Sequence, residues 1–220
     1  MVLAQLSPPR PFAEQIVADT ALMQQTLLPL ASERIAAYIQ LLAKWNRTYN
    51  LTAVRDVQDM RVRHVLDSLA VRPWIKSGGS LVDVGSGPGL PGILLALADA
   101  TLDVTLIDSN LKMTRFAEAA VRTLSIDNVR VIRGRVEAIP ASSCDQVISR
   151  AFATPSDFLK LTAHLARPGG EWLAMRGRQD HHKDGPALPS RFICRKTIPL
   201  VVPGLNAQRH LQIYQQEVAS

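Results

Sequence analysis

The sequence predicts an α/β fold with a Rossmann-like parallel sheet and a helical extension at its N-terminus. Short apolar runs alternate with helix-length segments from residue 81 onward, and the first of these runs ends in a glycine-rich turn. Before them, apolar residues recur at helical spacing. With 220 residues, 47% of them hydrophobic, the chain can build one sizeable core with an appendage. We expect the extension to span residues 1–75, packed on the α/β domain of residues 76–220.

Apolar residues at helical spacing indicate that the N-terminal extension consists of helices. Residues 11–49 predict two or three helices with a break near Pro29, and the pair Ser32 and Glu33 is typical of a helix start. The periodicity is interrupted at residues 50–52 and resumes over 57–74, where one face is cationic. We therefore expect a group of helices that leads the chain to the first strand.

The α/β domain is predicted from its short apolar runs. Strands are expected at residues 81–84, 102–107, 129–132, 146–149 and 171–175. Helices are expected between them at residues 93–100, 111–124 and 155–165. A last pair of runs, 191–197 and 211–214, is suited to an antiparallel hairpin at the end of the sheet.

The glycine-rich turn after the first strand predicts a ligand site. Gly85, Gly87 and Gly89 let the backbone bend and approach a ligand without a Cβ in the way. Counted from Gly87, the turn matches the dinucleotide pattern G-x-G-x-x-G; counted from Asp83, it reads D-x-G-x-G-x-G. An acidic residue so close disfavours a pyrophosphate, whereas S-adenosylmethionine carries an ammonium and a sulfonium and no phosphate. The register therefore favours S-adenosylmethionine as the cofactor.

Asp108 ends the second predicted strand, about twenty residues after the glycine turn, where a carboxylate can bind the ribose hydroxyls of a nucleoside. Dinucleotides and S-adenosylmethionine both use such a carboxylate. Asp108 could also cap the helix that follows, and the two roles are compatible.

Charge and composition point to a cytoplasmic protein with a polyanionic partner. The chain has 25 basic and 19 acidic residues, a formal charge of +6, and 5% aromatic residues, too few for a base-stacking platform. Two cysteines argue against a disulfide scaffold or a cysteine-rich zinc site, and we expect no metal. No apolar stretch suits a bilayer and no signal pattern starts the chain, so we expect no membrane partner. The basic residues that suggest RNA or DNA form three clusters: Arg55, Arg61, Arg63, His64 and Arg72; Arg130, Arg133 and Arg135; and Arg176, Arg178, His181, His182 and Lys183.

The residues after the fourth strand restrict the methyl acceptor. The segment 149–152 reads Ser-Arg-Ala-Phe and lacks the Asn/Asp-Pro-Pro-aromatic turn of enzymes that methylate base amino groups. Neither cysteine has the setting of a nucleophile for pyrimidine carbon 5. Guanine N7 has a free in-plane lone pair and needs only alignment with the methyl–sulfonium bond. Arg150 could bind the cofactor carboxylate or the guanine O6 edge, and Val136 and Glu137 lie where adenine is expected.

Taken in order along the chain, these motifs resemble the small-subunit ribosomal RNA methyltransferase G family, also called glucose-inhibited division protein B. The resemblance covers residues 30 to 215. It rests on the segments 50–52 (Asn-Leu-Thr), 63–69 (Arg-His-Val-Leu-Asp-Ser-Leu), 82–92, 108–112, 135–137, 149–152 and 209–211 (Arg-His-Leu).

The resemblance implies a seven-stranded class I methyltransferase fold with an N-terminal helical extension. It implies methyl transfer from S-adenosylmethionine to guanine N7 in the 530 loop of 16S ribosomal RNA, with the RNA or the small ribosomal subunit as partner. Separately, we expect a monomer. By motif position, the implied cofactor contacts are Gly85, Leu90, Val136, Glu137 and Arg150, beside Gly87, Gly89 and Asp108 from the turn and second strand.

Arg150 is the expected catalytic residue, and we expect RNA contacts from Arg63, His64, Arg176 and Arg209. The fifth strand ends in Arg176-Gly177 where relatives often have Lys-Gly, so a contact that depends on lysine geometry does not carry over. Three alternatives remain: a ribosome-assembly or RNA-binding factor that binds S-adenosylmethionine without transfer, a methyltransferase with another acceptor, and a nicotinamide-dependent dehydrogenase.

Overall fold

The computed structural model describes residues 10–150, 154–177 and 187–217. Its N-terminal part is helical, as expected, and contains α1 (Arg10–Leu22), α2 (Pro29–Tyr49), α3 (Val57–Met60), the π-helix η2 (Arg61–Leu66), α4 (Asp67–Leu69) and the 3₁₀ turn η3 (Arg72–Trp74). The helix start expected at Ser32 and Glu33 is wrong. Proline is compatible with the first helical position because its φ is already fixed, so α2 begins at Pro29, and the Ser32 hydroxyl donates to the Pro29 carbonyl at 2.7 Å.

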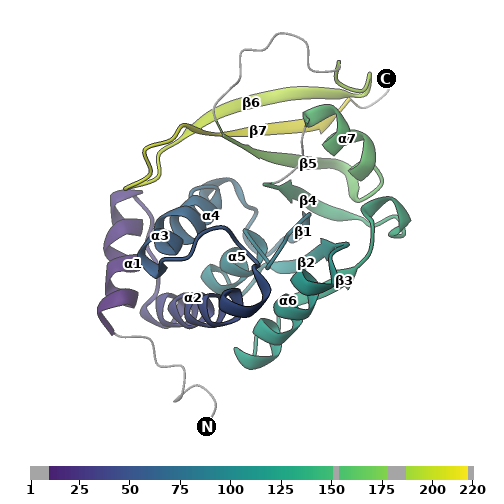
Figure 1. The fold of residues 1–220 in the computed structure, drawn as a ribbon. Helices are drawn as coiled ribbons and strands as arrows, with labels where there is room; N and C mark the ends of the chain where they lie inside the picture. Colours follow the sequence, from purple (N-terminus) through teal and green to yellow (C-terminus); the bar gives the residue numbers. More distant parts are fainter. Residues whose placement is uncertain (1–9, 151–153, 178–186, 218–220) are drawn as a thin grey trace.

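The described residues after η3 form an α/β unit with one seven-stranded sheet, which confirms the predicted fold class (Figure 1). Its elements are β1 (Ser80–Val84), α5 (Gly92–Ala98), β2 (Asp103–Asp108), α6 (Leu111–Thr123), β3 (Val129–Arg133), η4 (Val136–Ala138), β4 (Cys144–Ser149), α7 (Pro155–Thr162), β5 (Ala166–Arg176), β6 (Phe192–Leu200) and β7 (Arg209–Gln216). The strand order is β3-β2-β1-β4-β5-β7-β6.

The direction and order of the strands indicate where a ligand site is expected. The strands β3, β2, β1, β4 and β5 are parallel, while β7 runs antiparallel to both of its neighbours, β5 and β6. The strand order reverses between β1 and β4, and in such sheets ligands bind outside the carboxyl ends of the strands at that point. The glycine turn follows β1 and Arg150 follows β4, so the chain brings both to this edge.

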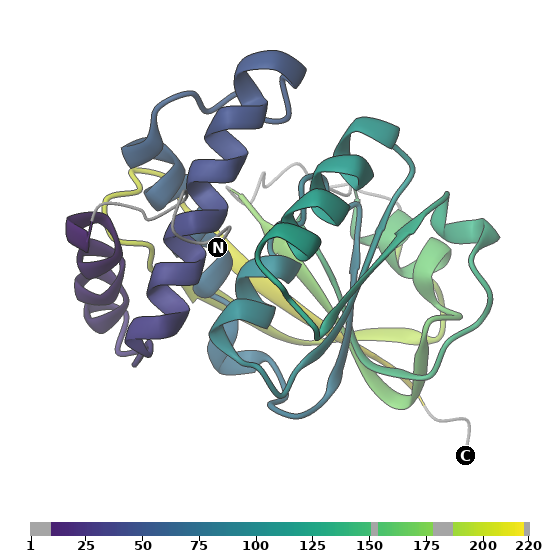
Figure 2. The same ribbon diagram turned by 90° about the horizontal axis from the view of Figure 1, so that it is seen from below.

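Each face of the sheet has its own apolar layer. Leu81 and Leu106 belong to a cluster that continues through α5 and α6 into α2 and η2, whereas Val82 and Val147 pack with residues of η4 and α7. Figure 2 shows α1 and α2 beside the sheet at the end opposite α7. The N-terminal helices therefore share one hydrophobic core with the sheet.

Candidate active site

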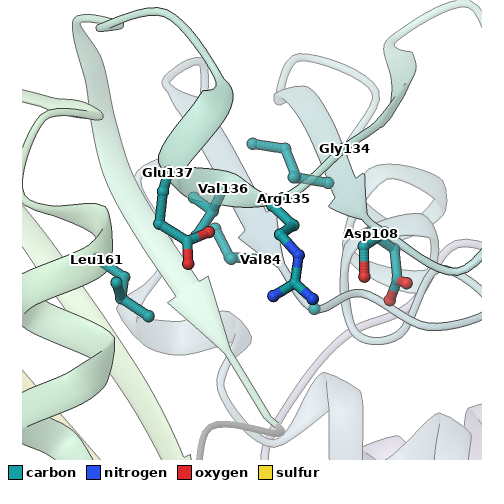
Figure 3. Close-up of a pocket in the computed structure, with 10 residues that line it drawn as sticks. Val84, Asp108, Gly134, Arg135, Val136, Glu137 and Leu161 are labelled. Carbon is teal, nitrogen blue, oxygen red and sulfur yellow. The ribbon is translucent and has the colours of Figure 1, made fainter.

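A cavity of about 250 Å³ opens at the carboxyl ends of β1 and β2. Its lining combines apolar side chains with a few polar groups, as nucleoside sites do. Figure 3 shows the cavity between the η4 segment and Asp108. The lining residues are Val84, Gly85, Ile107, Asp108, Ser109, Gly134, Arg135, Val136, Glu137 and Leu161.

The glycine turn has the conformation that its sequence predicts. Gly85, Gly87 and Gly89 have φ values of 68°, 56° and 101°, a region that side chains rarely adopt. A Cβ on Gly89 would also overlap the Ile93 side chain. Gly85 lines the cavity, whereas Leu90 is buried in the core and its N–H donates to the Ser86 carbonyl at 2.8 Å.

Asp83 lies behind the turn and not in the cavity. Its side chain is fully buried, and its Oδ2 accepts a hydrogen bond from the Gly92 N–H at 2.7 Å. Burial raises the pKa of this carboxyl to about 7. A Cβ on Gly92 would overlap Leu106 and lie 2.9 Å from Asp83 Oδ2, so this glycine allows the strand and α5 to meet. Asp83 therefore fixes the turn from beneath.

Asp108 joins the second strand to the glycine turn. Its Oδ2 accepts from the Gly87 N–H and its Oδ1 from the Asn110 N–H, both at 2.8 Å. The cap of α6 is Asn110, whose side chain accepts from the Lys112 N–H, so the helix-cap alternative for Asp108 is wrong. A carboxylate has about four lone-pair sites, so Asp108 keeps acceptor capacity for a ribose.

The η4 segment forms the far wall of the cavity. Val136 is buried and Glu137 is exposed, and both line the cavity. Arg135 and Leu161 also line it and were not among the expected cofactor contacts. In Figure 3 the Arg135 and Glu137 side chains extend from η4 into the space between Leu161 and Asp108. Arg135 precedes Val136 in a motif already singled out, but no local signal indicates that α7 brings Leu161 here.

Arg150 lies at the same edge but outside this lining. Its Nη1 is 3.5 Å from Asp67 Oδ2 and 3.4 Å from the Arg63 carbonyl oxygen. Arg209 Nε donates to the other oxygen of Asp67 at 2.8 Å. The structure thus brings together Arg150 and Arg209, one expected at the cofactor and one at the RNA, on one carboxylate.

The other residues expected to contact RNA differ in exposure. Arg63 is exposed and Arg176 half-buried, but His64 is only 5% exposed and its Nε2 lies 2.9 Å from the Thr52 hydroxyl. Burial and the nearby Arg150 charge lower the pKa of His64 to about 4, so the ring is neutral at pH 7. Arg178, His181, His182, Lys183 and Phe152 lie outside the described residues.

Within residues 10–150, 154–177 and 187–217, no group of three His, Cys, Asp or Glu side chains is arranged to hold a metal ion. In the same part of the chain, no helix has the length and apolar composition needed to cross a bilayer.

Comparison with known proteins decides the family. The model of the family described as rRNA small subunit methyltransferase G matches residues 31–212. The chain belongs to this family. A ribosomal RNA small subunit methyltransferase G from Neisseria meningitidis serogroup C is 45% identical over 200 residues, covering 91% of this chain and 96% of the relative. One from Methylobacillus flagellatus is 50% identical over 181 residues, covering 82% and 86%. The family expected from the ordered motifs is thereby confirmed.

Solved structures agree on the fold. A SAM-dependent methyltransferase from Aquifex aeolicus has a TM-score of 0.54 and 16% identity, covering 70% of this chain and 92% of its own. TrmN from Thermus thermophilus has a TM-score of 0.56 and 19% identity, covering 78% and 53%. At these identities the likeness supports the class I methyltransferase fold alone.

Proposed function

We infer that this protein transfers a methyl group from S-adenosylmethionine to N7 of a guanine in the 530 loop of 16S ribosomal RNA. The observation that carries the proposal is the cavity at the carboxyl ends of β1 and β2, in a chain that belongs to the rRNA small subunit methyltransferase G family. The glycine turn and Asp108 on one side of this cavity, and the η4 wall on the other, are the parts that an adenosyl group requires.

The residues present fit S-adenosylmethionine. Asp108 can accept hydrogen bonds from the ribose hydroxyls, and the apolar surfaces of Val136 and Leu161 can hold the adenine. Gly85 and Gly87 leave the backbone open to the methionine part, and Arg150 supplies a guanidinium for its carboxylate or for the guanine O6 edge. When bound, the cofactor supplies a methyl group on a positively charged sulfur, and the sulfur keeps the electron pair of the broken bond.

Guanine N7 accepts this methyl group through its own lone pair, and no proton has to leave. The protein therefore needs to align the two groups and to exclude water, and it does not need a general base. The groups at this edge agree with that requirement, because the Arg150 guanidinium has hydrogen-bond donors but no acceptor, and His64 is buried against Thr52. Arg150 is the catalytic residue that we propose, acting through its fixed charge.

We propose that Arg63, Arg176 and Arg209 contact the RNA backbone, since arginine binds phosphate well. Because His64 is buried, we propose that it supports the segment that carries Arg63 and does not itself contact the RNA. We also propose that the enzyme is monomeric. Sedimentation of the purified protein would test the oligomeric state.

The deciding experiment follows labelled methyl transfer from S-adenosylmethionine to small ribosomal subunits from a strain that lacks this gene, with deproteinised 16S RNA and duplex DNA alongside. Label at one guanine N7 of the ribosomal RNA is expected. Label at another base would point to a different acceptor. Binding of S-adenosylmethionine without any label would favour an assembly factor, and binding of NADH in its place would favour a dehydrogenase.

A further inference from the structure

Asp67 holds two arginines that come from distant parts of the chain. Its side chain is 4% exposed, and it meets Arg150 from the end of β4 and Arg209 from the start of β7. We propose that Asp67 is a positioning residue, which fixes the Arg150 guanidinium beside the cofactor and links it to the RNA-contacting Arg209. This inference rests on the proposed function, because it takes the roles of both arginines from it.

The segment that carries Asp67 is built for this contact. In the π-helix η2 the backbone hydrogen bonds skip one residue more than in an α-helix, and such turns occur often at functional sites. Here η2 turns the Arg63 carbonyl oxygen toward Arg150 Nη1, at 3.4 Å, while Asp67 directly follows the π-helix. One short segment thus supplies both acceptors of Nη1.

These contacts leave the rest of the guanidinium for a ligand. A guanidinium has five N–H donors, and Nη1 carries two of them. Both of these contacts are made by Nη1, with the Arg63 carbonyl oxygen and with Asp67 Oδ2. Holding Nη1 from one side therefore sets the direction in which the other three donors meet a carboxylate or a guanine edge.

The segment 50–52 supports η2 from behind. The Asn46 side chain accepts from the Thr52 N–H at 2.9 Å and donates to the Val54 carbonyl at 3.0 Å, which holds this turn against α2. The Thr52 hydroxyl then meets His64 Nε2 at 2.9 Å, one turn before Asp67. The two N-terminal motifs of the family, around Thr52 and around Asp67, thereby form one support for Arg150.

The test compares Asp67→Asn with a matched control, Asp145→Asn. Asp145 also accepts hydrogen bonds from an arginine, Arg167, but at the opposite end of β4. We expect Asp67→Asn to lower the methylation rate at saturating substrates by about 10²-fold, since small misplacements of an aligned group cost that much. Its affinity for S-adenosylmethionine, measured by calorimetry, falls with it. Asp145→Asn keeps both values, and Asp67→Glu recovers part of the loss.

The double variant Asp67→Asn/Arg150→Ala separates positioning from a general structural effect. If Asp67 acts through Arg150, removing Asp67 has no further effect on cofactor binding once Arg150 is gone. The double variant then binds S-adenosylmethionine as tightly as Arg150→Ala alone. Losses that add would overturn the proposal, as would an Asp67→Asn enzyme that melts earlier but binds and methylates normally below its melting temperature.

A second variant covers the case in which Asp67→Asn fails to fold. Arg209→Gln keeps the Asp67 carboxylate beside Arg150, so we expect unchanged affinity for S-adenosylmethionine and a raised KM for the ribosomal substrate. A lost cofactor affinity in Arg209→Gln would contradict this division of roles. If the wild-type protein transferred no methyl group, the calorimetric comparisons would still decide whether Asp67 acts through Arg150, so the two failures can be told apart.

Discussion

The Asp108 carboxylate accepts a hydrogen bond from the Gly87 N–H at 2.8 Å, which ties the end of β2 to the turn after β1. One side chain therefore shapes the glycine turn and also faces the cavity that the turn borders. The effect of a substitution at this position should appear in cofactor binding before it appears in stability.

Asp108→Asn should weaken the binding of S-adenosylmethionine by about tenfold to a hundredfold, the loss of one hydrogen bond to a charged group. Calorimetry measures this directly. Asp103→Asn is the matched control, since Asp103 begins the same strand and is exposed at the other end. Equal affinities for the two variants would show that Asp108 does not contact the ribose.

Arg150→Ala should reduce methyl transfer by about 10²- to 10³-fold while the protein stays folded, because a fixed charge beside the reacting groups is lost. The measurement is single-turnover transfer to small ribosomal subunits. Arg167→Ala serves as control, since it also removes an arginine bound to an aspartate, far from this edge. Unchanged transfer in Arg150→Ala would remove Arg150 from the mechanism.

Gly92→Ala should destabilise the protein by about 1–3 kcal/mol, the usual cost of forcing extra atoms into a packed core. The new Cβ would overlap Leu106 and press on the Asp83 carboxylate. Denaturant unfolding measures the difference. Gly177→Ala is the control, because its nearest neighbour, Arg209 Nη1, would be 3.7 Å away. A stable Gly92→Ala protein would mean that β1 and α5 can move apart.

The raised pKa of the buried Asp83 carboxyl should make the stability of the folded protein depend on pH. Its pKa rises from 3.8 to about 7 on folding, so between these values the folded protein binds more protons than the unfolded chain. Its contribution is complete below pH 3.8 and is lost as the pH rises through 7. Asp83→Asn removes this term, so the melting temperature of the variant should improve relative to the wild type from pH 5 to pH 8.

His64 contributes with the opposite sign over part of this range. Its pKa falls to about 4 on folding, so protonation below its ordinary value of 6.5 favours the unfolded chain. This term is present in both proteins and cancels in their difference. A difference in melting temperature that stays constant with pH would show that Asp83 titrates normally.

RNA binding should weaken steeply with salt, because phosphate contacts release counterions. Arg63→Gln should lower the slope of log K against log salt by about 0.7, the value for one phosphate on a single strand. Arg195→Gln, an exposed change on β6, should leave the slope unchanged. Fluorescence anisotropy with a labelled RNA loop gives both slopes. A flat response in the wild type would exclude phosphate contacts.

The parts of the fold that local sequence determines were predictable. The strands β1 to β4 contain short apolar runs, and the turn after β1 needs glycine at positions with positive φ, so both leave a direct mark on the sequence. The strand β5 begins at Ala166, before its predicted run of residues 171–175, and its first half was missed because it is polar and contains proline and glycine. The places of Asp108 and Val136 at the cavity were predictable too, because each comes at or just after the end of a parallel strand and the carboxyl ends of these strands meet at one edge.

The remaining features depend on contacts between distant segments. Arg209 and Asp67 are separated by 142 positions, and nothing near either residue indicates the pairing. His64 looked like a surface cation beside Arg63, but the wider turn of the π-helix places it inside the core against Thr52. The place of Asp83 has a local cause: Val84 lines the cavity, and the adjacent side chain of a pleated strand points to the other face of the sheet.

The place of β7 in the sheet has a consequence for how the protein is made. Among the described residues this strand comes last along the chain, yet it lies between β5 and β6, and its first residue is Arg209. Synthesis proceeds from the N-terminus, so Asp67 leaves the ribosome long before its second arginine does. A nascent chain, or one cut short before residue 209, lacks the strand that joins β5 to β6. In such a chain Asp67 also lacks its contact with Arg209. Only a chain that extends to Arg209 can place both arginines on Asp67.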